Sequence, residues 1–212
     1  MITPRPTSDS HATRRLLAQV QAGQATALST LLARHRAYLR QVVELYLDPR
    51  LRQRVDPSDI VQEAQLEATR RMDDYLARPA LAFRLWLRRI AYDRLLMLRR
   101  RHHGAQRRAL AREAALPEQS TARLGQQLLD DGTSPSAQAV GGELARRVRQ
   151  ALLYLPVDDR ELLLLRNFEG LSNLEVAELL GLEPAAASKR YGRALLRLRA
   201  RLVESGLAGS QP

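Results

Sequence analysis

Apolar residues recur at spacings of three and four along most of this 212-residue chain, which is the spacing of one helix face. No run of four to eight residues alternates apolar and polar side chains as a strand does. Aromatic residues make up only 4% of the sequence, which favours small helical domains with Leu and Ala cores over packed sheets. The sequence therefore predicts an all-α fold.

Proline, glycine and polar residues divide the helical pattern into two small domains. We expect the first domain to cover residues 11–103. Its expected helices are 11–21, 25–47, 56–77 and 79–101. The expected core of the second helix is Leu28, Leu31, Leu32, Leu39 and Val43. Asp56 is expected to cap the third helix, because Pro57 after it suits a first helical position.

The helical pattern degrades between residues 104 and 142, where Gly, Pro, Ser and Thr accumulate. This segment is expected to be a flexible linker with one helical piece around 106–115. A second domain is expected at 143–205. Residues 1–10 are expected to be disordered, and residues 206–212 are expected to form a tail.

The second domain carries the signature of a helix-turn-helix. Ser172 and Glu175 have the spacing of a capping box, which opens a short helix, and Gly181 suits the left-handed residue that closes it. Two short helices joined by a tight turn are typical of this motif. A second capping box is expected upstream, with Glu161 reaching back to the amide of Asp158.

The next helix, with Pro184 at its first position, has an apolar face and a basic face. Its apolar stripe is Ala187, Tyr191, Ala194, Leu198 and Leu202. Its basic face is Lys189, Arg190, Arg193 and Arg197, with Ala186 and Ser188 at the N-terminal end. Recognition helices dock on DNA by this end, where an arginine can fork onto guanine. A solvated surface is the alternative, but the cap, glycine, proline and alanines in register favour DNA.

The formal net charge of +11 comes almost entirely from arginine, because Lys189 is the only lysine. Arginine forks onto phosphate and guanine edges, so the charge favours a nucleic-acid partner. The alternative is that arginine usage reflects the base composition of the genome. A membrane surface is disfavoured, because the basic segments lack an apolar aromatic face.

Several classes of protein are disfavoured by what the sequence lacks. There is no cysteine, which excludes disulfides and thiolate metal sites. No apolar run approaches the ~20 residues of a membrane span, and we expect a cytoplasmic location with no membrane partner. No histidine follows a glutamate by three residues, which disfavours a helical-bundle metalloenzyme. We expect no cofactor and no catalysis, because no phosphate loop or nucleophile motif is present.

A basic segment closes the first domain. Ten arginines and one acid, Asp93, lie between Arg84 and Arg112. Basic residues interleaved with aromatics suit single-stranded DNA, which stacks its bases on exposed rings. Tyr92 is the expected stacking residue, whereas Phe83 and Trp86 are expected in the core because they follow the apolar stripe.

An acidic patch stands out within this basic chain. Asp56, Asp59 and Glu63 are three and four residues apart, so they share one face of the expected helix and repel one another. Such a cluster is either solvated or faces a cationic partner. Asp56 and Asp59 also suit the first turn of a helix, where the dipole stabilises carboxylates, but Glu63 lies two turns in.

Three segments resemble one family when taken in order. The residues from Asp56 to Ala64 resemble the Asp-x-x-Asp-Leu-Val-Gln-Glu motif of sigma-70 factors. The residues from Phe83 to Ala91 resemble their Phe-x-x-Trp-Leu-x-x-Ile-Ala segment, and those from Leu182 to Arg199 resemble their terminal helix-turn-helix. The chain is identified by these motifs as a member of the extracytoplasmic-function (ECF) group of sigma-70 factors.

The resemblance implies a transcription initiation factor that binds core RNA polymerase and promoter DNA. It implies contacts with the clamp helices of the largest polymerase subunit for Asp56, Asp59, Gln62 and Glu63. It implies contacts with the −10 element for Arg89, Tyr92, Asp93, Arg94, Arg99, Arg100 and Arg101. It implies contacts with the −35 element for Ala186, Ser188, Lys189, Arg190, Arg193 and Arg197. It also allows for an anti-sigma factor as a partner.

Some positions depart from the family pattern. The family often has Asn where this chain has Asp93, which either accepts from cytosine or pairs with Arg89 or Arg94. Ser188 stands where a basic residue is frequent. The alternative function is a stand-alone helix-turn-helix regulator, which would leave the acidic face without a role.

Overall fold

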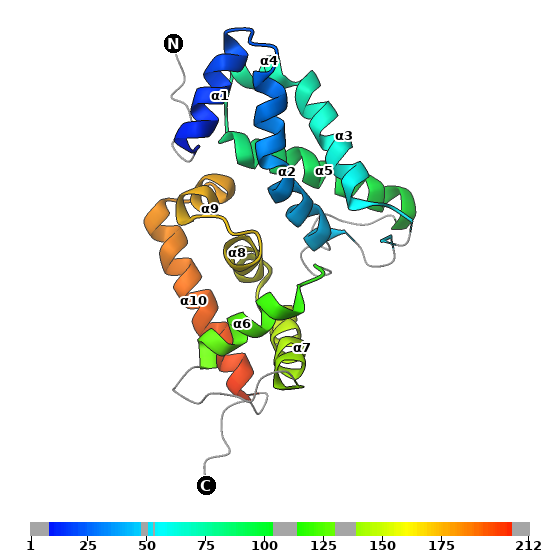
Figure 1. The fold of residues 1–212 in the computed structure, drawn as a ribbon. Helices are drawn as coiled ribbons and strands as arrows, with labels where there is room; N and C mark the ends of the chain where they lie inside the picture. Colours follow the sequence, from blue (N-terminus) through cyan, green and yellow to red (C-terminus); the bar gives the residue numbers. More distant parts are fainter. Residues whose placement is uncertain (1–8, 48–50, 53, 104–113, 130–138, 205–212) are drawn as a thin grey trace. The chain divides into compact units, whose positions relative to one another are not determined.

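A computed structural model of the chain describes residues 9–47, 51–52, 54–103, 114–129 and 139–204. Every regular element in these ranges is a helix, which confirms the predicted all-α class. The chain divides into two compact units, Met1–Ala115 and Leu116–Pro212 (Figure 1). Each unit has its own core and is described by itself.

The first unit holds the helices α1 to α5. They are α1 (His11–Gln21), α2 (Ala27–Tyr46), α3 (Pro57–Arg70), α4 (Met72–Ala77) and α5 (Phe83–His103). The long helix α2 packs against α1, α3 and α5, so it forms the centre of this unit (Figure 1). Of its expected core residues, Leu31, Leu32, Leu39 and Val43 are buried, whereas Leu28 is half-buried.

Phe83 anchors the core of the first unit and is completely buried. Its ring lies edge-on to Tyr75, with centroids 5.5 Å apart, and to His35, with centroids 5.3 Å apart. Trp86 is half-buried and packs on Tyr75. The predicted core position is confirmed for Phe83, whereas Trp86 is only partly buried.

Helix α5 begins at Phe83 and not at Pro79, because a side chain from the N-terminus caps it. Asp9 accepts a hydrogen bond from the Phe83 amide at 2.9 Å, and Ser10 caps α1 by accepting from Thr13. Asp9 and Ser10 therefore have defined structural roles, although the sequence predicted disorder for residues 1–10. Residues 1–8 lie outside the described ranges.

The helix predicted at 56–77 is two helices, α3 and α4, which meet at Arg71 (φ −102°). Its predicted start is confirmed, because Asp56 accepts a hydrogen bond from the Ser58 amide at 2.7 Å and Pro57 is the first helical residue. The cap fixes the direction in which α3 leaves the loop, and so fixes which face carries the acidic residues.

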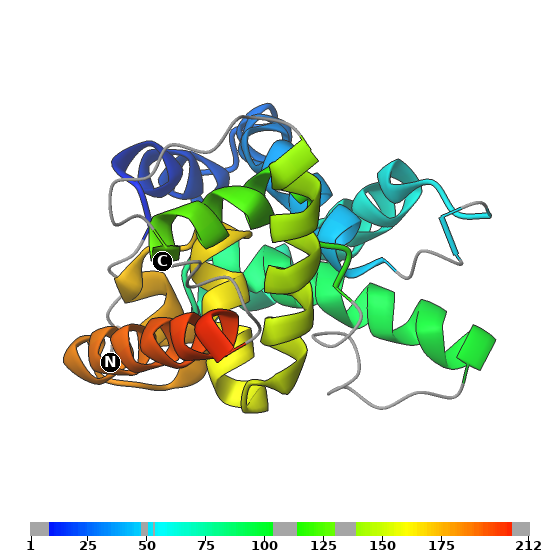
Figure 2. The same cartoon turned by 90° about the horizontal axis from the view of Figure 1, so that it is seen from below.

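The second unit holds α6 to α10. They are α6 (Glu118–Leu129), α7 (Ala139–Tyr154), α8 (Val157–Asn167), α9 (Asn173–Leu180) and α10 (Pro184–Leu202). Helix α6 falls within the segment predicted to be a linker, and it packs against α7 (Figures 1 and 2). Its Thr121, Ala122 and Leu124 are buried, so this part of the expected linker belongs to the second unit. The helical piece expected at 106–115 lies almost wholly outside the described residues.

The helix-turn-helix is formed by α9 and α10. Ser172 and Glu175 make both hydrogen bonds of the predicted capping box, at 3.2 and 2.8 Å. Gly181 closes α9 with φ 65° and ψ 35°, a left-handed conformation that favours glycine. In the turn, Asn173 donates a hydrogen bond to the Pro184 carbonyl at 2.8 Å. The local predictions for this motif are confirmed.

The capping box predicted at Asp158 is wrong. Pro156, and not Asp158, is the N-cap residue of α8, and it makes no side-chain cap hydrogen bond with a described residue. The two aspartates that follow, Asp158 and Asp159, lie in the first turn and point their carboxylates at arginines of α10. The Asp158 carboxylate therefore takes part in a tertiary ion pair with Arg190, which the sequence did not suggest.

Candidate protein and nucleic-acid interfaces

The acidic residues of α3 form an exposed face, which we call the α3 acidic face: Asp56, Asp59, Gln62 and Glu63. Asp56 is partly used by the cap described above. Among the described residues, no ion pair involves Asp59 or Glu63. The buried side of the same helix carries Ile60 and Ala64, so the fold orients the carboxylates to solvent.

Glu67 shows the opposite arrangement one turn further along α3. It lies 2.8 Å from Arg94 on α5 and also contacts Arg70 and Arg71. Burial raises the pKa of Glu67. The positive charges of Arg71, and then of Arg94 and Arg70, lower this pKa by more than burial raises it, so the pKa lies below its ordinary value of 4.5. This cluster links α3 to α5, and it engages Arg94, which the sequence placed at the −10 DNA.

The basic segment of α5 offers fewer exposed groups than its sequence suggests. Arg89 and Arg100 are exposed, whereas the side chains of Arg99 and Arg101 lie outside the described part. Tyr92 is half-buried, with its ring edge-on to Tyr46 at 5.3 Å between centroids. The Arg88 guanidinium lies 5.1 Å from the same ring. Tyr92 is therefore held by the core on one side, and Asp93 beside it is half-buried as well.

Helix α10 buries most of the apolar stripe that the sequence predicts. Ala187, Ala194, Leu198 and Leu202 are fully buried. Tyr191 is half-buried and donates a hydrogen bond to Asn167 of α8 at 3.0 Å. The side chains at the N-terminal end and along the opposite face are exposed, namely Ala186, Ser188, Lys189, Arg193 and Arg197. This packing leaves the N-terminal end of α10 accessible to a groove.

Two arginines of α10 are bound within the unit. Arg190 lies 2.7 Å from Asp158 and 3.7 Å from Asp159, and Arg197 is hydrogen-bonded to Asp159. Asp159 is buried and Asp158 is exposed. Of the α10 cations predicted to meet DNA, Lys189 and Arg193 are the exposed ones that form no ion pair with a described residue.

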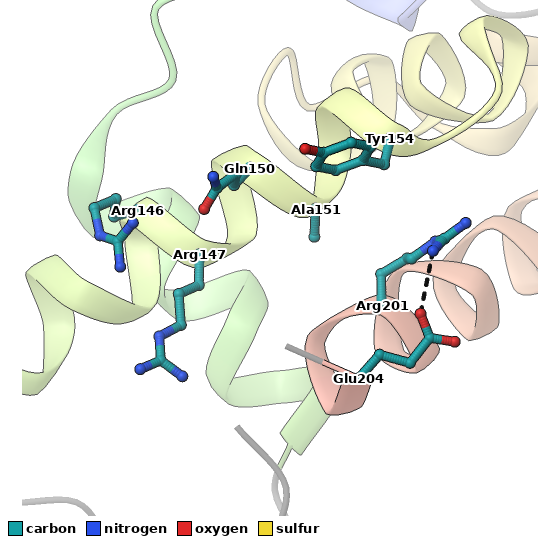
Figure 3. Close-up of a pocket in the computed structure, with 7 residues that line it drawn as sticks. All are labelled: Arg146, Arg147, Gln150, Ala151, Tyr154, Arg201 and Glu204. Carbon is teal, nitrogen blue, oxygen red and sulfur yellow. Dashed lines mark hydrogen bonds and ion pairs between the residues drawn. The ribbon is translucent and has the colours of Figure 1, made fainter. Parts of the chain in front are cut away.

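A cleft of about 420 Å³ lies between α7 and the C-terminal end of α10 (Figure 3). It is lined by Arg146, Arg147, Gln150, Ala151, Tyr154, Arg201 and Glu204. Arg146 and Arg147 both bind Glu143, and their hydrogen bonds lower its pKa to about 2. Arg201 binds Glu204 at 3.1 Å. Each arginine already has a carboxylate partner, so the cleft has little charge left to select an anion.

Sequence reasoning missed the carboxylates that hold three arginines predicted to contact DNA: Arg94, Arg190 and Arg197. Glu67, Asp158 and Asp159 act across helices, and spacing along one helix gives no sign of such partners. The one available signal was the pair of adjacent acids in the first turn of α8, which the sequence analysis assigned to a cap. Among the described residues, no group of acids and histidines is arranged to hold a metal ion, and no helix could span a bilayer.

Comparisons with known proteins agree with this architecture. Residues 145–198 match the family described as Sigma-70, region 4. RNA polymerase sigma factor CnrH of Cupriavidus metallidurans is 31% identical over 191 residues, which cover 90% of this chain and 94% of CnrH. The probable RNA polymerase sigma factor RfaY of Xanthomonas campestris is 38% identical over 146 residues, but the chain spans only 34% of that protein.

A solved structure shows the same fold. The structure of CnrH in complex with the cytosolic domain of CnrY matches with a TM-score of 0.53 and 29% identity. The match covers 92% of this chain and 99% of the CnrH chain. The two units, the helix-turn-helix and these matches define the class of protein as an RNA polymerase sigma factor.

The chain belongs to the sigma-70 family, in its extracytoplasmic-function group. Members of this family are transcription initiation factors, so the function predicted from the sequence is confirmed at this level. The assignment of particular residues to polymerase and to each promoter element remains a prediction.

Proposed function

We propose that this sigma factor docks on core RNA polymerase through the α3 acidic face. The observation that carries the proposal is the exposure of Asp59 and Glu63 in a chain of net charge +11, with no ion pair to any described residue. Among the other acids of the first unit, Glu44 and Glu67 are bound by arginines. Asp73 and Asp74 are exposed, but they lie in the first turn of α4, where the helix dipole stabilises them. Complementary charge favours a basic partner surface, and the family resemblance suggests the clamp helices of the largest subunit.

Charge reversal tests the docking face. The variant Asp59→Lys/Glu63→Lys should lose retention on immobilised core polymerase, with affinity weakened roughly tenfold or more, because two attractive contacts become repulsive. Both residues are exposed, so the first unit should still fold. Retention is measured by pull-down and quantified by titration of labelled protein.

A matched control carries the same change of charge on another helix. Asp73 and Asp74 are exposed in the first turn of α4, and Asp73→Lys/Asp74→Lys should be retained like the wild type. Equal retention of both double variants would refute docking through α3. Failure of the wild type itself to bind core polymerase would instead favour a stand-alone helix-turn-helix regulator.

The second unit is proposed to read the −35 element as duplex. The support is that α10 leaves Ala186, Ser188, Lys189 and Arg193 exposed at its N-terminal half, where recognition helices enter the major groove. Arg193 is the residue best placed to fork onto a base or a phosphate, because no described carboxylate holds it. Arg190 and Arg197 belong to the same surface but are restrained by α8.

The first unit is proposed to meet the −10 element through α5. Arg89 and Arg100 are the exposed candidates among the described side chains, and Arg94 is engaged by Glu67. Tyr92 is proposed to contact DNA with the edge of its ring that the Tyr46 contact leaves uncovered. Asp93 is half-buried, which suits a role in shaping this surface more than direct contact with phosphate.

The partners proposed for the whole chain follow from this division of surfaces. They are core RNA polymerase and promoter DNA, which place its action in the cytoplasm. CnrH was solved with the cytosolic domain of CnrY. We propose by analogy that an anti-sigma factor also binds this chain. No catalytic role and no cofactor are proposed, because the family acts through binding.

A further inference from the structure

The N-terminal turn of α8 faces the DNA-side arginines of α10. Asp158 and Asp159 are adjacent in this turn, where the helix dipole stabilises their negative charge. One carboxylate binds Arg190 at 2.7 Å and the other binds Arg197. The contacts join residues that are far apart in sequence and lie on the two helices that pack together in the second unit.

The two aspartates differ in exposure, and this separates their roles. The side chain of Asp159 is 6% exposed and touches both arginines, so it ties α8 to α10 as part of the folded unit. The side chain of Asp158 is 73% exposed and, among the described residues, forms an ion pair with Arg190 alone. An exposed carboxylate contributes little to folding, but it can compete with a phosphate for the same guanidinium.

We propose that Asp158 is a positioning residue that withholds Arg190 from DNA phosphates. The proposal rests on the proposed function, in which α10 is the helix that enters the duplex. Binding of a phosphate by Arg190 must first displace Asp158, the nearer of its two carboxylate partners, so this arginine adds little to binding on random DNA. The ion pair therefore lowers the sequence-independent affinity for DNA. The choice between DNA sequences then depends more on base contacts by neighbours such as Arg193.

The charge balance of the surface supports this role. Lys189 and Arg193 are exposed and form no ion pair with a described residue. Arg190 is only 28% exposed, because its guanidinium is drawn toward α8. Sequence-independent affinity rises with each phosphate that a protein neutralises, and the salt dependence steepens by about 0.9 for each one. An arginine that is paired with a carboxylate neutralises no phosphate until that ion pair breaks.

A double-mutant cycle tests the restraint on the full chain. The variants are Asp158→Asn, Arg190→Ala and the double variant, and binding to a mixed-sequence duplex is followed by fluorescence anisotropy at several low salt concentrations. Asp158→Asn should tighten binding by about two- to fivefold, the upper part of the range expected from one exposed ion pair, and should steepen the salt slope by about 0.9. In the Arg190→Ala background, Asp158→Asn should change neither the affinity for the duplex nor the salt slope.

Two results would overturn the proposal. Equal tightening in both backgrounds would show that Asp158 acts only through the repulsion between its charge and DNA. If Asp158→Asn binds the duplex no more tightly than the wild type, Arg190 does not bind a phosphate when its ion pair with Asp158 is removed. Because Asp158 is exposed and caps no helix, the variant should fold, and its circular dichroism melt checks this.

The test is separable from the proposed function. Binding to a mixed-sequence duplex at low salt needs only the basic surface, so the cycle is readable without polymerase. Asp158→Asn should also leave retention on core polymerase unchanged, because the α3 acidic face belongs to the first unit. A wild type that fails to bind polymerase would refute the proposed function while the coupling between Asp158 and Arg190 is still measured.

Discussion

Individual carboxylates decide which cations of this protein are available to a partner. Arg94, Arg190 and Arg197 were all predicted to contact DNA, and each is bound by an acid from a neighbouring helix. Lys189 and Arg193 lie on the same basic surface of α10 without such a partner among the described residues. The effective charge of a surface is therefore smaller than its arginine content suggests.

Glu67 makes the stability of the first unit depend on pH. Its pKa is lowered in the folded state, so its stabilising effect is present above the ordinary value of 4.5 and is lost as pH falls below it. Glu67→Gln should lower the melting temperature at pH 7, and the difference from wild type should shrink at about pH 3. Fluorescence of Trp86, the only tryptophan, reports unfolding of this unit.

Glu44→Gln is the matched control for this prediction. It removes an exposed pair with Arg40 one turn away on α2 and should have little effect at either pH. A loss of melting temperature in Glu67→Gln that is the same at both pH values would mean that the carboxylate charge is not what links α3 to α5.

At the scale of elements, the packing of α6 against α7 depends on a glycine. A Cβ added to Gly125 would lie 2.8 Å from a methyl group of Val148 and 2.9 Å from the Leu144 side chain. Valine has little freedom to move away from such a contact. The close approach lets α6 bury Ala122 and Leu124, and this packing turns a segment of weak helical pattern into a helix.

Alanine substitutions at two helical glycines isolate this packing effect. Gly125→Ala and Gly192→Ala both gain helix propensity, but nothing lies within 4 Å of the added Cβ at Gly192. Gly192→Ala should therefore be the more stable variant, by about 1–3 kcal/mol. Urea unfolding followed by circular dichroism measures the difference, and equal stabilities would contradict a tight α6–α7 contact.

At the scale of the molecule, the surface proposed for polymerase and the surface proposed for the −35 duplex belong to separate compact units. The α3 acidic face belongs to Met1–Ala115, and the helix-turn-helix belongs to Leu116–Pro212. The buried side chains of each unit come from its own helices, such as Phe83 in the first and Leu198 in the second. This division suggests that polymerase docking and duplex reading can be separated experimentally.

Expression of each unit alone tests that division. Fragment 1–115 should keep retention on core polymerase, and fragment 116–212 should keep duplex binding and the effect of Asp158→Asn. Each should unfold in one cooperative transition, because a compact unit under 150 residues usually does.

Fragment 116–212 is expected to need α6, so a shorter fragment that starts at residue 139 should be less stable. Loss of helical circular dichroism in either longer fragment would show that its core is incomplete.

The sequence by itself determined the features that depend on residues close along the chain. The caps at Asp56 and Ser172, the left-handed Gly181 and the buried stripe of α10 are set by neighbours within one or two turns, and all are present in the structure. The family motifs are local in the same way. Such features are predictable because backbone geometry fixes which neighbours meet.

Only the tertiary structure decided which charged groups are paired. Arg94 and Glu67 are 27 residues apart, and Arg197 and Asp159 are 38 residues apart. No helical spacing relates such residues, so the sequence assigned these arginines to DNA and Asp158 to a cap. Packing of α8 against α10 brings the opposite charges together, and Coulomb attraction at contact distance then holds them.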